Sequence, residues 1–331
     1  MEKKVKDITD GSDSNIADNP WHDSADHDIG DAVPFKLTAT LPNNMKAYET
    51  YTLIFHDELS AGLQLNPASV KVLLYPSKHR ADADVTLTEG VDVTDFFQIQ
   101  TTGSKFDLGC EDIRLIDGVD SNKAIVVYYT ANLTEAAVVG SAGNPNEVYL
   151  EFSNNPYNET TGETTKDKVT VFTYKLVINK VDNHGHSLAG AGFTLSKLNY
   201  ATGKFEAIGE ELKGDNMTVF TWTGLDDGEY LLSETTVPEG YNALADVKFA
   251  LLATHDETND NPQLTVLDGG LMGIGDLPTG TMTKDIVNST GTVLPETGAQ
   301  GTMMLIGGGA IFVIVAAVFM VTRKKMSVYE F

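Results

Sequence analysis

Short runs of β-branched and aromatic residues alternate with turn signals along most of the chain. Between residues 31 and 288, the runs with the strongest β pattern are 52–55, 70–75, 124–129, 148–152 and 169–181. Turn-forming clusters such as 183–185 (NHG) and 226–228 (DDG) punctuate the pattern, and it contains no long amphipathic helix. This arrangement predicts an all-β protein built of β-sandwiches.

A polar stretch at residues 154–168 (NNPYNETTGETTKDK) interrupts the β pattern. It divides a first module, residues 1–167, from a second, residues 168–291, which is followed by a tail, residues 292–331. Each module has a size typical of one domain. We therefore expect two sandwich domains in tandem, with a distinct C-terminal tail.

The tail contains an apolar run of 19 residues at 303–321, and the basic triplet Arg323-Lys324-Lys325 follows it. As a helix rising about 1.5 Å per residue, this run is just long enough to cross a hydrocarbon core of roughly 30 Å. The basic triplet is expected to stay on the cytoplasmic side, which places both modules outside the cell. Composition alone is compatible with either a permanent or a temporary membrane anchor.

The pentapeptide Leu294-Pro295-Glu296-Thr297-Gly298, upstream of the apolar run, resembles the LPxTG motif of sortase substrates. The motif, the apolar span and the basic tail stand in the order typical of cell-wall sorting signals in Gram-positive bacteria. The resemblance implies that a sortase cleaves between Thr297 and Gly298 and joins Thr297 to peptidoglycan or to another pilin subunit. The protein would then contact the membrane only through its tail, before cleavage.

The second module resembles the Cna protein B-type domains of Gram-positive pilins and adhesins. The similarity rests on residues 176–182 (LVINKVD), 188–195 (LAGAGFTL) and 230–241 (YLLSETTVPEGY), and the last of these resembles the E-box of that family. The resemblance implies an immunoglobulin-like sandwich with an intramolecular isopeptide site, which falls on three residues of this chain: Lys180, Glu234 and Asn288.

The strand phase supports a buried site at these residues. With a period of two, the three polar side chains share strand faces with apolar neighbours: Leu176 and Ile178 for Lys180, Tyr230 and Leu232 for Glu234, and Ile286 for Asn288. Burial favours the neutral forms of an amine and a carboxyl group. A neutral Lys180 could then attack the Asn288 side-chain carbonyl while Glu234 shuttles protons, forming a Lys–Asn bond without a cofactor.

The first module resembles the isopeptide-forming middle domain of backbone pilins, which is Cna A-like. The similarity covers residues 29–63 and 144–156. It implies Asp57 as the acid and Asn154 as the amide. The strand phase agrees, because each of the two follows apolar residues at alternating positions.

The lysine of the first module is less clearly marked. We expect Lys4, because Lys4 precedes Val5 as Lys180 precedes Val181 in the second module. Lys3 and Lys36 remain alternatives, and the apolar phase around Lys36 points its side chain outward.

The composition excludes several functions. The 331 residues include 23 Lys and Arg against 47 Asp and Glu, a formal net charge of −24. Nucleic-acid binding is not expected, because phosphate backbones require clustered cations. The single cysteine, Cys110, allows no internal disulfide. We expect no cofactor, no metal and no enzyme activity, because no corresponding motif is present.

The N-terminal residues 1–7 lack the apolar core of a signal peptide. We therefore expect a fragment of a longer precursor or a misassigned start. Residues 75–78 (YPSK) depart from the lysine motif through which backbone pilins polymerise, and we interpret them as a strand end and a turn.

The leading hypothesis is a structural fimbrial subunit, extracellular and anchored to the cell wall, that supports adhesion. The alternative is a monomeric wall-anchored adhesin that binds a host matrix protein or glycan. A host surface ligand is therefore a partner to test, beside the sortase, peptidoglycan and other pilin subunits.

Overall fold

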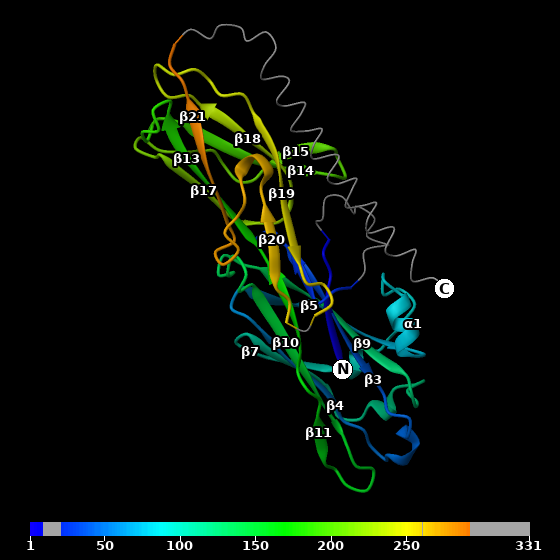
Figure 1. The fold of residues 1–331 in the computed structure, drawn as a ribbon. Helices are drawn as coiled ribbons and strands as arrows, with labels where there is room; N and C mark the ends of the chain where they lie inside the picture. Colours follow the sequence, from blue (N-terminus) through cyan, green and yellow to red (C-terminus); the bar gives the residue numbers. More distant parts are fainter. Residues whose placement is uncertain (9–20, 260, 292–331) are drawn as a thin grey trace, which may run out of the picture. The chain divides into compact units, whose positions relative to one another are not determined.

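The computed structural model describes residues 1–8, 21–259 and 261–291, and this part of the chain is all-β, as predicted (Figure 1). One short α-helix, α1 (Lys78–Ala83), accompanies the strands of the described residues, with 3-10 turns at Met45–Ala47, Thr94–Phe96, Ile113–Leu115 and Gly270–Met272. None of the helices in these ranges is long and apolar enough to cross a membrane. The sorting motif 294–298, the apolar run 303–321 and the basic residues 323–325 lie outside the described residues.

Residues 1–239 and 243–288 form one compact unit, and this unit contains two β-sandwiches. Among the described residues, 240–242 group with 289–291 in a second unit. Within that second unit, Asn242 donates its backbone N–H to Ser289 O at 3.0 Å and its side-chain amide to Gly291 O at 3.0 Å.

The first sandwich has two sheets. One sheet is ordered β1 (Glu2–Val5), β3 (Ala32–Thr40), β9 (Ala124–Leu133), β5 (Leu63–Tyr75) and β6 (Val91–Asp92). The other is ordered β2 (Ser24–Asp26), β12 (Asp167–Phe172), β10 (Asn144–Ser153), β4 (Leu53–Leu59), β8 (Lys105–Cys110) and β7 (Gln98–Thr102), and β11 (Thr161–Glu163) pairs with β10. Phe35, Val127 and Phe55 illustrate the shared core, because side chains of both sheets alternate into it.

The second sandwich places the first and last of its strands side by side (Figure 1). Its smaller sheet is ordered β17 (Val219–Leu225), β13 (Tyr174–Asp182) and β21 (Thr281–Asn288), and β13 and β21 are parallel. Its larger sheet is ordered β15 (Lys204–Ala207), β14 (Gly192–Asn199), β18 (Gly228–Thr236), β19 (Val247–His255) and β20 (Leu264–Asp268), and β16 (Leu212–Lys213) pairs with β14.

The run 169–181, expected as one strand, is divided between the two sandwiches. β12 pairs antiparallel with β10 in the first sandwich, whereas β13 pairs with β17 and β21 in the second. The buried Thr173 lies between the two strands, and its hydroxyl donates to Leu225 O at 3.1 Å. The polar stretch 154–168 contains β11 and the start of β12, so the change of sandwich falls later in the chain, at Thr173.

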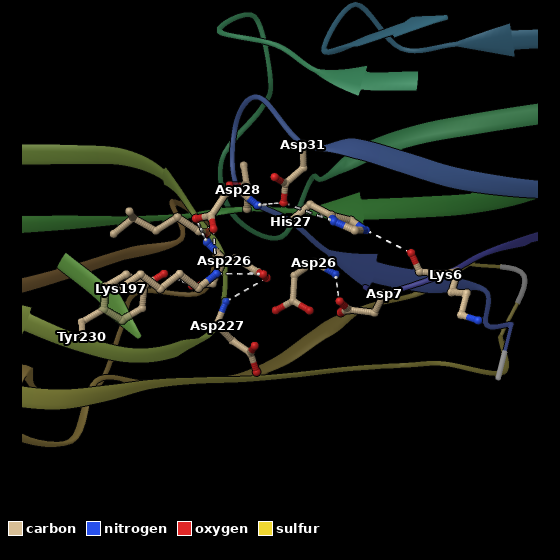
Figure 2. A network of polar contacts seen from close by, with 12 residues as sticks. Lys6, Asp7, Asp26, His27, Asp28, Asp31, Lys197, Asp226, Asp227 and Tyr230 are labelled. Atoms are coloured by element: carbon tan, nitrogen blue, oxygen red, sulfur yellow. Dashed lines mark hydrogen bonds and ion pairs between the residues drawn. The ribbon is translucent and has the colours of Figure 1, made fainter. Parts of the chain in front are cut away.

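Partly buried polar contacts join the two sandwiches (Figure 2). Lys197, on β14, donates through Nζ to Asp28 Oδ2 at 2.7 Å and to Asp226 Oδ2 at 3.0 Å. Asp28 Oδ1 also accepts a hydrogen bond from the backbone N–H of Asp226 at 2.9 Å. His255 Nε2, on β19, lies 3.2 Å from Asp26 Oδ1. The segment that follows β2 is thereby fixed to the second sandwich.

The charges in this junction are strongly perturbed by burial. Desolvation raises the pKa of Asp226 to about 7, although the neighbouring Lys197 opposes the rise. The pKa of His27 is also raised. Desolvation acts to lower it, but the hydrogen bond with Asp31 and the negative charge of Asp226 have the larger combined effect. Burial therefore disfavours the ionised form of Asp226. The protonated form of His27 is favoured by the acidic residues around His27.

We predict that the protein loses stability as the pH rises from about 5 to about 8. A carboxyl group with a raised folded-state pKa stabilises the fold while protonated, and this contribution is lost as the pH rises from about 4 through about 7. A raised histidine pKa acts in the same direction above about pH 6.5. The melting temperature should fall by roughly 5 °C over this range.

The Asp226→Asn variant provides the control for this prediction. Its amide mimics the protonated carboxyl group, so its melting temperature should match that of the wild type near pH 5 and fall clearly less toward pH 8. Parallel curves for the two proteins would show that Asp226 is not the titrating group.

Candidate functional site

A lysine, an acid and an amide meet in the core of the first sandwich. Lys3, on β1, donates through Nζ to Asp57 Oδ2 of β4 at 2.5 Å and to Asn146 Oδ1 of β10 at 2.6 Å. Tyr129, on β9, places its hydroxyl 3.1 Å from Lys3 Nζ and donates to Asp57 Oδ2 at 3.0 Å. All four side chains are buried. The site thus spans both sheets of the sandwich.

Burial shifts the acid–base balance of this cluster toward neutral groups. Desolvation lowers the pKa of Lys3 to about 8, against the opposing charge of Asp57. Desolvation also raises the pKa of Asp57, against the opposing charge and hydrogen bond of Lys3. The aromatic rings of Phe35 and Tyr129 lie 5.7 Å and 5.8 Å from Lys3 Nζ and exclude water around it. A neutral amine beside a protonated carboxyl group can therefore form here.

Lys3, and not the expected Lys4, occupies this site. In β1 the side chains of Lys3 and Val5 face the core, and Lys4 points away and pairs with Asp23 Oδ1 at 2.5 Å. The analogy with Lys180-Val181 of the second module selected Lys4, which is one position too late. Side chains alternate along a strand, so a lysine that shares the buried face with Val5 must be Lys3. Lys36 points outward, as expected, and its Nζ lies 5.2 Å from the ring of Trp21.

Asn146, and not the expected Asn154, is the amide beside Asp57. Asn154 follows the end of β10 and is exposed, where it donates to Thr161 O at 2.9 Å and accepts from Thr160 Oγ1 at 2.8 Å. Both asparagines have the same parity in the strand, so phase alone does not separate them. β10 ends at Ser153, so Asn146 lies within the strand and Asn154 lies beyond it.

Tyr129 is a residue of the site that the sequence pattern did not single out. Its hydroxyl accepts from Asn146 Nδ2 at 2.7 Å in addition to its contacts with Lys3 and Asp57. A signal exists, because Tyr129 alternates with Val127 and Ala131 on the buried face of β9. A buried tyrosine hydroxyl in such a row needs a polar partner.

The second sandwich brings Glu234 and Asn288 into direct contact. Asn288 Nδ2 donates to Glu234 Oε1 at 2.9 Å and to Oε2 at 3.0 Å. Glu234 Oε2 also accepts the backbone N–H of Leu244 at 2.9 Å, which holds the carboxylate in place. Glu234 comes from β18 in the larger sheet and Asn288 from β21 in the smaller one, so the pair bridges the two sheets.

Lys180 is fully buried next to this pair. Its Nζ donates to Val181 O at 3.0 Å and to Ile286 O at 3.2 Å, so the amine lies over the strand that carries Asn288. In the parallel register Lys180 is opposite Ile286, which places Lys180 and Asn288 on the same face of the sheet. Desolvation lowers the pKa of Lys180, against the opposing charges of Glu234 and Asp182.

The described chain contains two tandem β-sandwiches, each of which encloses a buried lysine, and its C-terminal segment identifies the class of protein. Residues 286–327 match the LPXTG cell wall anchor motif, and residues 174–258 match the SpaA family of prealbumin-like fold domains. The anchor match confirms that the protein is extracellular and attached to the cell wall.

More extensive similarity links the chain to streptococcal pilins. It is 26% identical over 232 residues to the trypsin-resistant surface T6 protein of Streptococcus pyogenes serotype M6, covering 65% of this chain and 40% of that protein's length. The structure of the group B streptococcus pilus 2b backbone protein has a TM-score of 0.54 at 24% identity, covering 82% of this chain and 97% of that one.

The T6 backbone pilin of Streptococcus pyogenes serotype M6 has a similar fold, with a TM-score of 0.56 at 19% identity over 88% of this chain and 70% of that one. These matches confirm the resemblance to LPXTG-anchored backbone pilins and the all-β fold. The two solved structures are both of pilus backbone proteins.

We predict that the two asparagines of the first module differ sharply in their effect on stability. Asn146→Ala removes a hydrogen-bond acceptor from the buried Lys3 amine, so the free energy of unfolding should fall by roughly 2–3 kcal/mol. Asn154→Ala, at an exposed site, should change it by less than about 0.5 kcal/mol. Urea unfolding followed by Trp21 fluorescence, in a Trp222→Phe background, reports on this sandwich. Equal losses in both variants would contradict the assignment of Asn146.

Proposed function

We propose that the chain is a structural subunit of a pilus shaft. The tandem fold that it shares with backbone pilins and its LPXTG anchor support this assignment. In this proposal a sortase cleaves between Thr297 and Gly298, and the Thr297 carbonyl is joined to an amine of peptidoglycan or of another subunit.

Each sandwich, in the same proposal, closes itself with an intramolecular Lys–Asn bond. The observation that carries this is the position of the buried Lys3 amine, 2.6 Å from the amide oxygen of Asn146 and 2.5 Å from the carboxyl group of Asp57. Effective concentrations in such an arrangement are very high, because the reacting groups are held together by the fold. The second bond would join Lys180 to Asn288.

The reaction in the first sandwich is an amide exchange. The neutral Lys3 Nζ attacks Cγ of Asn146, and Asp57 in its protonated form stabilises the charge that develops on the amide oxygen. Asp57 gives its proton to Nδ2 and is reprotonated by the attacking amine, and Nδ2 leaves as ammonia when the Cγ–Nδ2 bond breaks. One amine and one primary amide become one secondary amide and one ammonia. Tyr129 holds Nδ2 by accepting its hydrogen bond at 2.7 Å.

The second sandwich offers the same chemistry with a different arrangement. Glu234 accepts hydrogen bonds from Nδ2 of Asn288 with both carboxylate oxygens, so it can pass the proton that it takes from the attacking amine to the leaving nitrogen. Lys180 would attack from the neighbouring strand of the same sheet. No cofactor takes part in either reaction, and each site reacts once.

Intact mass tests both bonds. The purified protein should be lighter than its sequence mass by about 34 Da, because each bond releases one ammonia of about 17 Da. Lys3→Ala or Asn146→Ala should leave a single deficit of about 17 Da. The matched variants Lys4→Ala and Asn154→Ala should keep both deficits. A wild-type mass equal to the sequence mass would falsify the proposed bonds.

The second site is tested by the same measurement in the other half of the chain. Lys180→Ala, Asn288→Ala and Glu234→Ala should each remove one deficit and leave the one assigned to the first sandwich. Lys175→Ala, on the same strand as Lys180, provides the control and should retain both.

Sortase processing distinguishes a shaft subunit from a monomeric adhesin. In a Gram-positive host that carries a pilus sortase, the full-length precursor should appear as a ladder of high-mass species on denaturing gels. Deletion of residues 294–298 should abolish the ladder and release the protein. A single wall-linked band that depends on 294–298 would favour the monomeric adhesin.

A further inference from the structure

The hydroxyl group of Tyr129 contacts all three reacting residues of the first sandwich. It lies 3.1 Å from Lys3 Nζ, donates to Asp57 Oδ2 at 3.0 Å and accepts from Asn146 Nδ2 at 2.7 Å. These distances are in the range over which a proton passes between hydrogen-bonded heavy atoms. The hydroxyl therefore lies among the atoms that exchange protons in the proposed reaction.

Within the described part of the chain, Asp57 makes no direct hydrogen bond with Asn146. Its Oδ2 contacts Lys3 Nζ and the Tyr129 hydroxyl, and its buried Oδ1 has no hydrogen-bond partner among these residues. Lys3 Nζ contacts the other end of the amide, Asn146 Oδ1, at 2.6 Å. The hydrogen-bonded route from the acid to the leaving nitrogen therefore passes through the Tyr129 hydroxyl.

The second sandwich shows what the tyrosine replaces. There Glu234 contacts Asn288 Nδ2 directly, with its two carboxylate oxygens at 2.9 Å and 3.0 Å. The side chain of a glutamate is longer than that of an aspartate by one methylene group. The shorter Asp57 therefore needs an intermediate hydroxyl group to reach the leaving nitrogen, whereas Glu234 does not.

Aromatic packing holds the Tyr129 hydroxyl in this position. The ring stacks on Phe35, with the centroids 5.2 Å apart, and meets Phe106 edge to face at 5.1 Å. Phe106, on β8, is opposite Asp57 in the antiparallel register with β4, so one strand pair positions both the acid and the ring. Tyr129 is fully buried, which excludes bulk solvent as an alternative proton carrier.

Burial also keeps the hydroxyl group of Tyr129 protonated. Desolvation raises the pKa of Tyr129 well above its usual value, and the charge of Asp57 acts in the same direction. A group that relays a proton must hold one at rest and accept a second one as it donates the first. A phenol that does not ionise at neutral pH meets this requirement, because each transfer returns it to its starting form.

We propose that Tyr129 is a catalytic proton relay between Asp57 and the leaving nitrogen of Asn146, an inference that rests on the isopeptide reaction proposed above. After Lys3 Nζ has bonded to Cγ, Nδ2 is an amine whose lone pair accepts a proton. Asp57 Oδ2 then transfers its proton to the Tyr129 oxygen while the Tyr129 O–H proton moves to Nδ2. The Cγ–Nδ2 bond breaks, ammonia leaves, and a proton from the Lys3 amine restores Asp57. Tyr129 ends unchanged.

The rate of bond formation tests the relay. The parent protein is Lys180→Ala, in which a single deficit of about 17 Da reports the bond of the first sandwich. The protein is made by short cell-free synthesis, translation is stopped, and samples are denatured in acid at intervals for intact mass. Tyr129→Phe keeps the ring and removes the hydroxyl, so the deficit should appear at least about 100-fold more slowly. Tyr128→Phe, on the outward face of the same strand, should react at the parent rate.

A second substitution separates a proton relay from a purely positional role. Asp57→Glu gives the first sandwich an acid of the same length as Glu234, and the space left by the missing hydroxyl accommodates the added methylene group. In the Tyr129→Phe background it should accelerate bond formation at least about tenfold, because the longer acid reaches Nδ2 directly. A tyrosine that only held the amide in place would not be replaced in this way. Circular dichroism and melting temperature verify that the variants fold.

Two results would overturn the relay. One is an equal rate of bond formation in the parent protein and in Tyr129→Phe. The other is a slow Tyr129→Phe variant that Asp57→Glu does not accelerate, because the hydroxyl would then act only by holding the amide. A parent protein that shows no mass deficit at any time would instead overturn the bond between Lys3 and Asn146. The relay and the bond therefore fail by different results.

Discussion

A lysine side chain placed inside a β-sandwich core loses its hydration, and the loss must be compensated by partners or by deprotonation. Lys3 and Lys180 are both fully buried, and the structure surrounds them differently. Lys3 meets Asp57 and Asn146 across the two sheets. Lys180 lies over the neighbouring parallel strand. The strand order of each sandwich is what brings these partners into reach, so the fold and the candidate chemistry are coupled.

The two arrangements have different mechanical consequences. A bond between Lys3 and Asn146 would join β1 of one sheet to β10 of the other and so fasten the two layers of the first sandwich. A bond between Lys180 and Asn288 would join neighbouring strands within one sheet of the second. In a chain with a single cysteine, such bonds would supply the constraint that disulfides give to many secreted domains.

Much of the fold was predictable from the sequence, because alternation with a period of two survives in most strands. The same alternation placed Lys180, Glu234, Asn288 and Asp57 on buried faces, where the structure has them at least partly enclosed. The alternation did not identify the correct residue where the answer depended on the position of a strand end. Asn154 has the right parity but lies beyond β10, and the analogy that selected Lys4 ignored the phase of Val5.

Other features depend on contacts that no local pattern encodes. The junction of Asp28, Lys197 and Asp226 is assembled from segments far apart in the chain, so only the packing of the two sandwiches brings them together. The alternation in β9 indicates that Tyr129 is buried, but its partners come from other strands, so only the packing of the sandwich brings it into the first cluster.

The parallel pairing of β13 and β21 determines how a pulling force would pass through the second sandwich. Force from the anchor enters at the C-terminal end of β21 and leaves at the N-terminal end of β13, so the strands are loaded in shear along their length. A bond between Lys180 and Asn288 would transmit this force directly to β13 and bypass residues 181–287. With the bond between Lys3 and Asn146, residues 4–145 would be bypassed as well. The covalent path from Lys3 to the tail would then run through residues 146–180 alone, and both bypassed segments could keep their hydrogen bonds under load.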